Sequence, residues 1–135
     1  VVAGRDYENM NAKFKIENQR WTLDSEKDLI RSFDVGLMPI EDNVVGRGKC
    51  GFKLLQYMGL GVVGIATNVT VNGDIITDGE NGFLVKEDNS NWYEVLKKVL
   101  SLQNKFAVIG SNARKTVIKN YSFEANVTDY LKWVF

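Results

Sequence analysis

The residue types that are rare or absent in the sequence are the most informative. Its 135 residues include no histidine, one cysteine (Cys50) and one proline (Pro39). Without histidine the chain has no Ser-His-Asp triad and no Cys-His pair, and most zinc sites are excluded as well. A single cysteine excludes a disulfide framework. The longest weakly polar run, residues 59–66, is far shorter than the ~20 residues that span a bilayer.

The chain also lacks an excess of charge of either sign. It has 17 basic and 17 acidic residues, whereas a nucleic-acid-binding domain usually has a basic surplus, so nucleic acid is not an expected partner. Hydrophobic residues make up 44% of the chain, which excludes a disordered or low-complexity protein. A chain of this length is about one domain and can bury a core, so we expect residues 1–135 to form a single domain.

The first residues of the chain suggest that it is part of a longer protein. Val1 to Gly4 are typical of a strand that runs into a turn, and no initiator methionine precedes them. We therefore interpret the chain as a fragment of a longer protein. Short apolar runs then alternate with helical periods, and the runs predict strands at residues 1–3, 13–17, 34–40, 62–66 and 82–85.

Helices are predicted between and after these strands. Ser25, with Asp28 three residues later, is typical of a helix N-cap, and residues 52–58 form a second amphipathic segment. A short helix is expected between the turns at Asn72-Gly73 and Asp78-Gly79. Three apolar stripes at helical spacing follow, the last one after Ser122, and we assign their aromatic residues to packing: Trp92, Tyr130 and Trp133. The alternation predicts an α/β fold, a Rossmann-like doubly wound parallel sheet that ends in several helices.

One loop carries the features of a ligand site. Residues 45–53 contain three glycines and three cations, follow a predicted buried strand and open a helix. Ligands of such folds bind at the carboxyl ends of the strands, and free N–H groups at a helix start favour an anion. The segment is neither a Walker A loop nor a complete Gly-x-Gly-x-x-Gly fingerprint. At 100° per residue, Lys49, Lys53 and Gln56 share one face of the helix, opposite Leu54 and Met58. This polar stripe is either a ligand-binding face or an ordinary solvated one.

Other positions near the same sheet edge are candidates for ligand contact, and each also has a purely structural interpretation. Gly4 begins a segment that either approaches a nucleobase or forms a simple turn. Arg20 and Trp21 follow a predicted strand and are candidates to frame a base, although burial is the default for a tryptophan. Asn72 and Asp74 begin a short helix that faces the same crevice, where they either touch the ligand or cap the helix.

Four segments resemble those of family 4 (group 1) glycosyltransferases, in the family's order and spacing. Residues 32–39 (SFDVGLMP) resemble the family's strand with an aspartate and a later proline, and residues 51–61 (GFKLLQYMGLG) its Glu-Ala-Met-Ala-x-Gly segment. Residues 74–85 (DIITDGENGFLV) are similar to its Glu-Ile-Val-x-Asp-Gly-x-Asn-Gly-x-Leu-Val, and residues 121–123 to its Tyr/Phe-Ser-Trp. The resemblance covers nearly the whole chain.

The resemblance implies a GT-B fold, in which two Rossmann-like lobes hold a nucleotide-sugar donor mainly through the C-terminal lobe. This chain would be most of that lobe, without its first strand and helix and without the N-terminal, acceptor-binding lobe. The implied activity is retaining glycosyl transfer from a UDP- or GDP-sugar to a saccharide or lipid-linked acceptor, without a metal or cofactor. The implied location is cytoplasmic, with peripheral membrane contact through the other lobe. The alternatives are a nucleotide-sugar epimerase-like lobe of the same fold and a non-catalytic nucleotide-binding or interaction module.

The family's signature is a pair of glutamates separated by seven residues, the first near the donor sugar and the second on the ribose hydroxyls. In this sequence the two positions are Gly48 and Gln56, so both glutamates are absent. Gln56 can still bind a ribose through its amide, and Gln56→Glu is expected to be tolerated. The remaining candidates for the donor and its diphosphate are Arg47, Gly48, Lys49, Gly51, Phe52 and Lys53, with Lys49 and Lys53 ahead of Arg47. No catalytic residue is assigned.

Overall fold

A computed structural model describes residues 13–134 of the chain. Its centre is a three-stranded parallel sheet in the order β1-β2-β3. The strands are β1 (Val35–Met38), β2 (Val63–Thr67) and β3 (Phe83–Val85). Val35 pairs with Val63, and Ile65 pairs with Phe83. The predicted α/β architecture with a parallel sheet is therefore confirmed.

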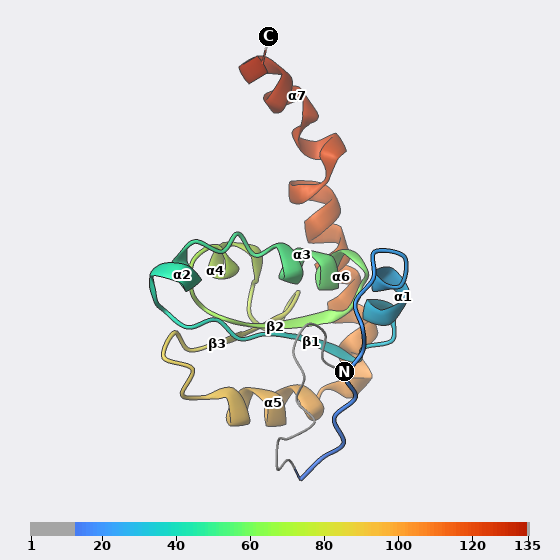
Figure 1. The fold of residues 1–135 in the computed structure, drawn as a ribbon, viewed down its shortest axis with the longest axis vertical. Coiled ribbons are helices and arrows are strands. Elements are labelled where there is room, and N and C mark those ends of the chain that lie inside the picture. The colour runs from blue at the N-terminus through green and yellow to red at the C-terminus, as the bar shows by residue number, and fades with distance from the viewer. Residues whose placement is uncertain (1–12, 135) are drawn as a thin grey trace.

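Helices cover both faces of this sheet (Figure 1). Helices α3 (Phe52–Gly59) and α4 (Asn72–Ile75) lie over one face, and α5 (Trp92–Leu100) lies over the other. Helix α6 (Phe106–Tyr121) follows the 3-10 turn η1 (Gln103–Lys105) and packs against both α3 and β2. Two short helices, α1 (Glu26–Arg31) and α2 (Val44–Arg47), stand before and after β1.

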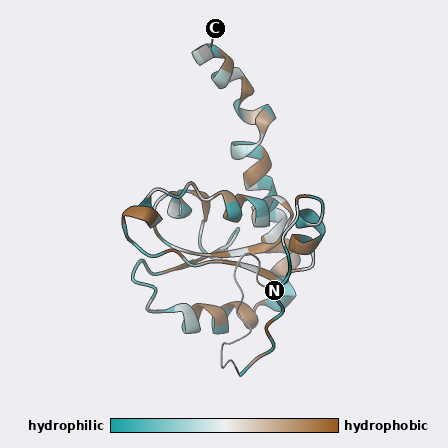
Figure 2. Cartoon of the chain, in the orientation of Figure 1, coloured by the Kyte–Doolittle hydropathy of each residue, from teal (hydrophilic) through white to brown (hydrophobic). Residues whose placement is uncertain are grey.

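The core consists of two apolar layers separated by strand β2, all of whose residues are buried. Such full burial is typical of a central strand in a parallel sheet. On one side Val63 and Ile65 pack with Val95 and Val99 of α5. On the other side Ala66 packs with residues of α3, α4 and α6, among them Leu54, Met58, Ile75 and Ala113. Figure 2 shows the corresponding apolar colouring on the strands and on the inner faces of the helices.

Helix α3 presents the predicted apolar face to this core. Leu54 and Met58 are fully buried, and Leu55 is half-buried at the margin of the same cluster. Tyr57 packs with Ile30 of α1 in a third, smaller cluster, which fixes α1 beside α3. Lys53 lies one turn before Tyr57 on this same side of α3, and it meets Glu26 of α1.

Three predictions near the start of the chain are corrected. Residues 13–17 form neither a helix nor a strand, although their polar and apolar residues alternate. Alternation of five residues produces a strand only where a sheet edge is available to pair with it. The strand predicted at 34–40 covers only residues 35–38. Ser25 occupies the N-cap position of α1, but its hydroxyl bonds with Thr22 and does not cap the helix. The strand predicted at residues 1–3 lies outside the described residues.

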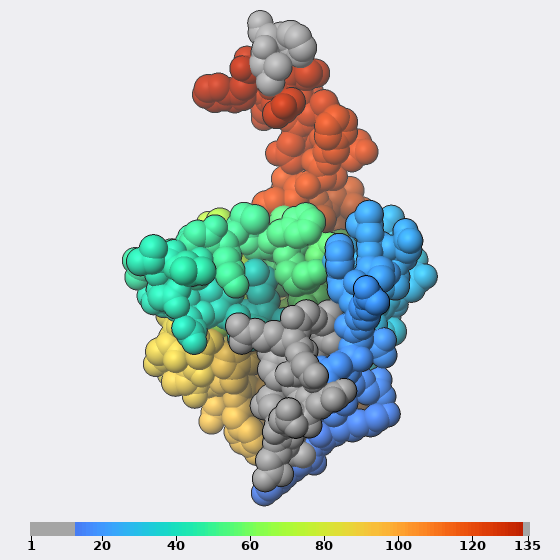
Figure 3. Space-filling view, viewed as in Figure 1, coloured from blue at the N-terminus to red at the C-terminus, as the bar shows by residue number. Residues whose placement is uncertain are grey.

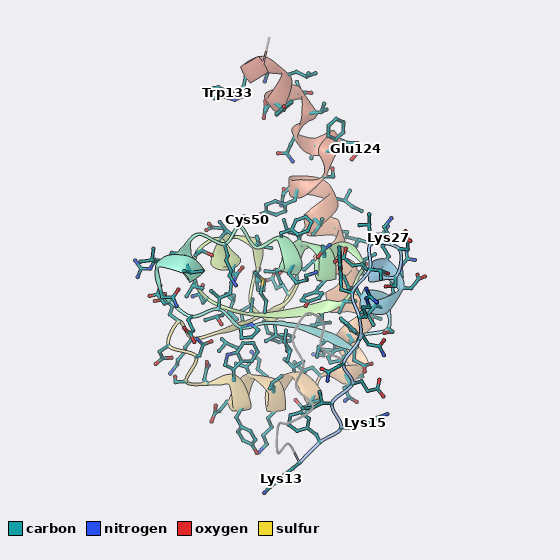
Figure 4. All side chains as sticks on the ribbon, in the orientation of Figure 1. Lys13, Lys15, Lys27, Cys50, Glu124 and Trp133 are labelled. Atoms are coloured by element: carbon teal, nitrogen blue, oxygen red, sulfur yellow. The ribbon has the colours of Figure 1, made fainter. Side chains whose placement is uncertain are left out.

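Helix α7 (Phe123–Val134) forms as predicted, with the hydroxyl of Ser122 accepting a hydrogen bond from the N–H of Ala125. Two of its aromatic residues do not pack, however: Tyr130 is 65% exposed and Trp133 is 90% exposed. The helix extends away from the rest of the molecule (Figure 3), and Trp133 projects near its end (Figure 4). The assignment of these two aromatic residues to packing is wrong, because helical spacing shows which residues share a face and not whether anything lies opposite. The half-buried Trp92 does pack against the core.

No helix in the described part of the chain is both long and apolar enough to cross a bilayer.

Candidate functional site

The candidate loop begins at the carboxyl end of β1 and returns to the sheet as helix α3. Short helix α2 interrupts it, and the side chain of Asn43 caps that helix by accepting a hydrogen bond of 2.8 Å from the N–H of Gly46. Cys50, labelled in Figure 4, marks the point just before α3. The structure therefore places the loop at the sheet edge where parallel α/β folds bind their ligands.

A polar network holds the start of this loop in place. The Ile40 N–H donates to the Thr67 hydroxyl over 3.0 Å, and that hydroxyl donates to the Asn89 side chain over 2.7 Å. Asn89 also donates to the carbonyl of Ile40 and accepts from the indole N–H of Trp92. Asn89 has a φ of 59°, a left-handed conformation that asparagine tolerates better than most residues. One side chain thus joins the exit of β1, the end of β2 and the start of α5.

Gly51 begins helix α3 in the left-handed conformation, with a φ of 71°. A Cβ atom at this position would lie 2.8 Å from Cδ1 of Ile75 and 3.1 Å from Cγ2 of Val71. The loop is therefore pressed against helix α4, and glycine meets both the conformational and the steric requirement. Gly48 is different, because it is exposed and has a φ of −79°.

The three cations of the loop have three different surroundings. The guanidinium of Arg47 makes two hydrogen bonds with Asp42, of 2.6 and 2.9 Å, and this contact lowers the pKa of the Asp42 carboxyl. The ammonium of Lys53 lies 2.9 Å from the carboxylate of Glu26. Lys49 is exposed and makes no ion pair with any residue between 13 and 134. Of the three side chains, Lys49 is the one whose charge no described residue compensates.

Glu26, the first residue of α1, is the centre of a polar cluster that also contains Trp21, Lys53 and Gln56. Its Oε1 accepts hydrogen bonds of 2.9 Å from both the ammonium of Lys53 and the indole N–H of Trp21. These bonds, chiefly that of Lys53, hold the pKa of Glu26 below its usual range, and the amide of Gln56 contributes in the same direction. The Oε1 atom of Gln56 is buried and has no hydrogen-bond partner among the described residues.

A second group of polar residues lines an open cleft of about 640 Å³ beside α2 and α4. Arg47 and Asp74 from the predicted set lie here, together with Asp42, Thr70 and Glu87. With three carboxylates and one guanidinium, the cleft is acidic and suits a phosphate poorly. The hydroxyl of Thr70 donates to the backbone carbonyl of Lys49 over 3.3 Å, which joins the cleft to the candidate loop.

Asn72 is fully buried and does not cap α4, whose N-cap residue is Val71. Its Nδ2 donates to the carbonyl of Thr67, and its Oδ1 has no partner among the residues that the structure describes. The capping alternative is therefore wrong for Asn72. A Cβ atom on Gly51 would lie 3.4 Å from this Oδ1, so Asn72 stands directly behind the start of α3.

The structure thus divides the sequence-predicted residues into two neighbouring groups. Lys53 and Gln56 gather around Glu26, whereas Arg47 and Asp74 line the acidic cleft. Gly48, Lys49 and Gly51 lie on the loop between them, and Phe52, the first residue of α3, is exposed. Gly4 lies outside the described residues. Trp21 is 49% exposed, so the default of a buried tryptophan is wrong. Sequence reasoning misses Glu26, because nothing in the sequence pairs two residues 27 positions apart.

The depressed pKa of Glu26 predicts how stability depends on pH. Since its pKa is lower in the folded protein than in the unfolded chain, ionised Glu26 stabilises the fold above about pH 4.3, the usual pKa of a glutamate. This contribution is lost as the pH falls through the folded-state pKa. The melting temperature of the protein should therefore exceed that of Glu26→Gln at pH 7, and the difference should shrink as the pH falls below about 4. Thermal melts of both proteins from pH 3 to 7 measure it, and a constant difference would contradict the pairing.

A family model described as "Glycosyl transferases group 1" matches residues 1–105 of the chain. The chain belongs to the group 1 glycosyl transferases. The match includes the candidate loop, helix α3 and the three strands of the sheet. It agrees with the resemblance carried by three of the four sequence segments, and the fourth, residues 121–123, lies outside the matched range.

The comparison with solved structures gives the same architecture. The crystal structure of TarM superposes with a TM-score of 0.63 at 21% identity, over 85% of this chain. This similarity supports the Rossmann-like fold of the GT-B type for the chain. The chain corresponds to 22% of the length of TarM, so it spans about a fifth of that protein. No curated protein sequence matches the chain significantly.

Proposed function

We propose that this group 1 glycosyl transferase chain is the donor-binding lobe of a retaining, metal-independent enzyme that transfers a sugar from a UDP- or GDP-sugar. The observation that carries the proposal is the position of Lys49. It lies in the loop that opens helix α3, at the carboxyl edge of the sheet, and its ammonium has no counter-ion among the described residues. A diphosphate would supply the compensating charge.

The residues around Lys49 suggest how the donor is oriented. The first N–H groups of α3 have no partner within the helix, so a phosphate at this end accepts hydrogen bonds from them. Lys53 follows on the same helix and contributes a second cation, which it shares with Glu26. Gln56 lies one turn further on, and its half-buried side-chain amide would bind a ribose hydroxyl. The donor would therefore run from the loop along the polar face of α3.

The contribution of this lobe to the reaction would be electrostatic stabilisation of the leaving group. As the acceptor hydroxyl attacks the sugar carbon from the face that the diphosphate leaves, negative charge develops on the departing phosphate oxygens. Lys49, Lys53 and the N–H groups of the loop are fixed before reaction and stabilise that charge. None of these groups transfers a proton, which agrees with the absence of histidine from the sequence.

The acceptor, a saccharide or lipid-linked saccharide, would bind to an N-terminal lobe in the complete protein, which would be cytoplasmic. The reaction site would then lie between two lobes, and this chain alone would be inactive.

Replacement of Gln56 by leucine in the intact protein tests the assignment. With ribose hydroxyls left unpaired at a cost of about 1–3 kcal/mol, UDP or GDP should bind about 5- to 150-fold more weakly, while the melting temperature is little changed. Isothermal calorimetry and thermal melts measure the two quantities. Lys97→Ala, on the exposed face of α5, is the control and should leave the affinity unchanged. If Gln56→Leu unfolds the protein but leaves the affinity of the folded fraction unaltered, Gln56 is structural and the assignment fails.

A further inference from the structure

Trp21 is an aromatic side chain that the fold leaves about half exposed but holds at one edge. The residue is 49% exposed, although tryptophan is usually well buried. Its indole N–H donates a hydrogen bond of 2.9 Å to Oε1 of Glu26, whose side chain is only 14% exposed. The hydroxyl of Thr22 accepts a hydrogen bond from the N–H of Ser25 and so holds the turn between Trp21 and α1. The indole is therefore restrained and open to a ligand at the same time.

Two contacts between α1 and α3 show where Trp21 lies relative to the candidate loop. Glu26 of α1 meets Lys53 of α3. Four residues further along each helix, Ile30 packs with Tyr57. The two helices therefore run in the same direction, and α1 begins at the end of the molecule where α3 begins. That end is the carboxyl edge of the sheet, to which the candidate loop belongs. Because the indole of Trp21 binds the first residue of α1, it lies at this same edge.

The indole also lies beside the cations that we assign to the donor. Its N–H and the ammonium of Lys53 are both 2.9 Å from the same oxygen of Glu26. Lys49, which we assign to the diphosphate, stands four residues before Lys53. A nucleoside diphosphate is longer than one helical turn of about 5.4 Å. With its phosphates at Lys49, its other end therefore extends past Lys53 towards the indole.

The chemistry of the indole favours the base over the other parts of such a ligand. Its one polar group, the N–H, is already bound by Glu26, so it has no hydrogen bond to offer a phosphate or a ribose hydroxyl. The surface that remains for a ligand is uncharged and aromatic, and it suits a planar aromatic group. A base that stacks on an aromatic side chain typically strengthens binding about 5- to 150-fold.

We propose that the indole of Trp21 is the surface on which the nucleobase of the donor stacks. The proposal rests on the proposed function, because it assumes a nucleoside diphosphate whose phosphates lie at Lys49. It gives Glu26 a place in the same site, since one carboxylate oxygen holds both the indole and the ammonium of Lys53. Every base has an aromatic face, so Trp21 would strengthen the binding of uridine and guanosine nucleotides alike.

Calorimetry on the intact protein with UDP, GDP and inorganic pyrophosphate tests the stacking. Trp21→Ala should weaken the binding of whichever nucleotide binds by about 5- to 150-fold. The affinity for pyrophosphate should not change, because pyrophosphate has no base. Trp21→Phe retains an aromatic ring and should lose less affinity than Trp21→Ala. Trp133→Ala is the matched control, since Trp133 is 90% exposed on α7, and it should leave every affinity unchanged.

Tryptophan fluorescence gives a second readout, which a purely structural role of Trp21 would not produce. A base stacked on the indole should quench its emission, so the nucleotide should quench the unmodified protein in a saturable way and pyrophosphate should not. The quenching should disappear in Trp21→Phe at a nucleotide concentration that still saturates this variant. It should persist in Trp133→Phe, which removes another of the chain's three tryptophans. If Trp21→Ala does not fold, the quenching in Trp21→Phe decides the question.

Three outcomes would overturn the proposal while the proposed function stands. Unchanged nucleotide affinity in Trp21→Ala means that the base binds elsewhere. Equal losses of affinity for the nucleotide and for pyrophosphate mean that Trp21 acts through the position of Glu26 and Lys53 and not by stacking. Quenching that persists in Trp21→Phe means that the base lies against another tryptophan. Failure of the unmodified protein to bind either UDP or GDP instead refutes the proposed function, and the inference with it.

Discussion

Replacement of Lys49 by alanine should weaken the binding of UDP or GDP by about 10- to 150-fold, because a hydrogen bond to a charged group contributes about 1.5–3 kcal/mol. Lys49 is exposed and makes no ion pair within the described part of the chain, so folding does not depend on its charge. The melting temperature should therefore remain that of the unmodified protein. Calorimetry on the intact protein at two salt concentrations gives the affinity and its salt sensitivity, and both should fall in the variant.

The other lysines provide graded controls for this result. Lys53→Ala should have a smaller effect than Lys49→Ala, since Lys53 divides its charge between Glu26 and the ligand. Lys97→Ala, on the exposed face of α5, should have none. Equal losses in all three variants would indicate general attraction between a basic surface and a phosphate, and the assignment of the loop as the diphosphate site would fail.

Replacement of Gly51 by alanine should destabilise the protein by about 2–5 kcal/mol. The left-handed conformation costs a non-glycine residue about 1–2 kcal/mol, and forcing a Cβ against packed side chains costs about 1–3 kcal/mol more. Ile75 and Val71 are those side chains, and their nearest atoms lie 2.8 and 3.1 Å from the position that the alanine Cβ would occupy. Urea denaturation of the two proteins measures the change in the free energy of unfolding.

Gly48→Ala is the matched control three residues away in the same loop. A Cβ at position 48 would have its nearest contact at 3.5 Å, with the carbonyl oxygen of Val45, and the φ of −79° suits any residue. The stability of Gly48→Ala should therefore lie within about 0.5 kcal/mol of the unmodified protein. Equal destabilisation by the two substitutions would show that the loop is sensitive to any side chain and that the contact of Gly51 with α4 is not the cause.

The central strand of the sheet is predictable from the sequence because it is buried on both faces. Apolar runs such as residues 62–66 are sufficient to identify such strands, and β2 lies at Val63–Thr67. The same reasoning fails at residues 13–17, where a short alternation resembles a half-buried strand but depends on a neighbour for pairing. It fails again for Tyr130 and Trp133, because a helical stripe does not reveal whether a surface lies opposite.

The residues of the candidate site that are close together in the sequence are predictable, whereas their contacts with distant parts of the chain are not. The glycines, the cations and Gln56 lie within one short segment, so their spacing is visible in the sequence. The partners that modify them come from elsewhere. Glu26 reaches Lys53 only because Ile30 of α1 packs with Tyr57 of α3, and no local pattern encodes that contact. The pairing of Arg47 with Asp42 is equally hidden, since a loop's path decides which of several nearby charges meet.

The hydrogen bonds of Asn89 have an entropic consequence for ligand binding. They fix the Ile40 end of the candidate loop, Asn43 fixes its first turn, and Gly51 fixes its last residue against α4. The conformational freedom of these backbone positions is therefore lost when the protein folds, before any ligand arrives. A ligand that binds to an ordered loop does not have to supply the free energy of ordering it. More of the interaction energy between ligand and loop therefore appears as binding affinity. Asn89, which lies outside the loop, thus helps to set the entropy of binding at Lys49.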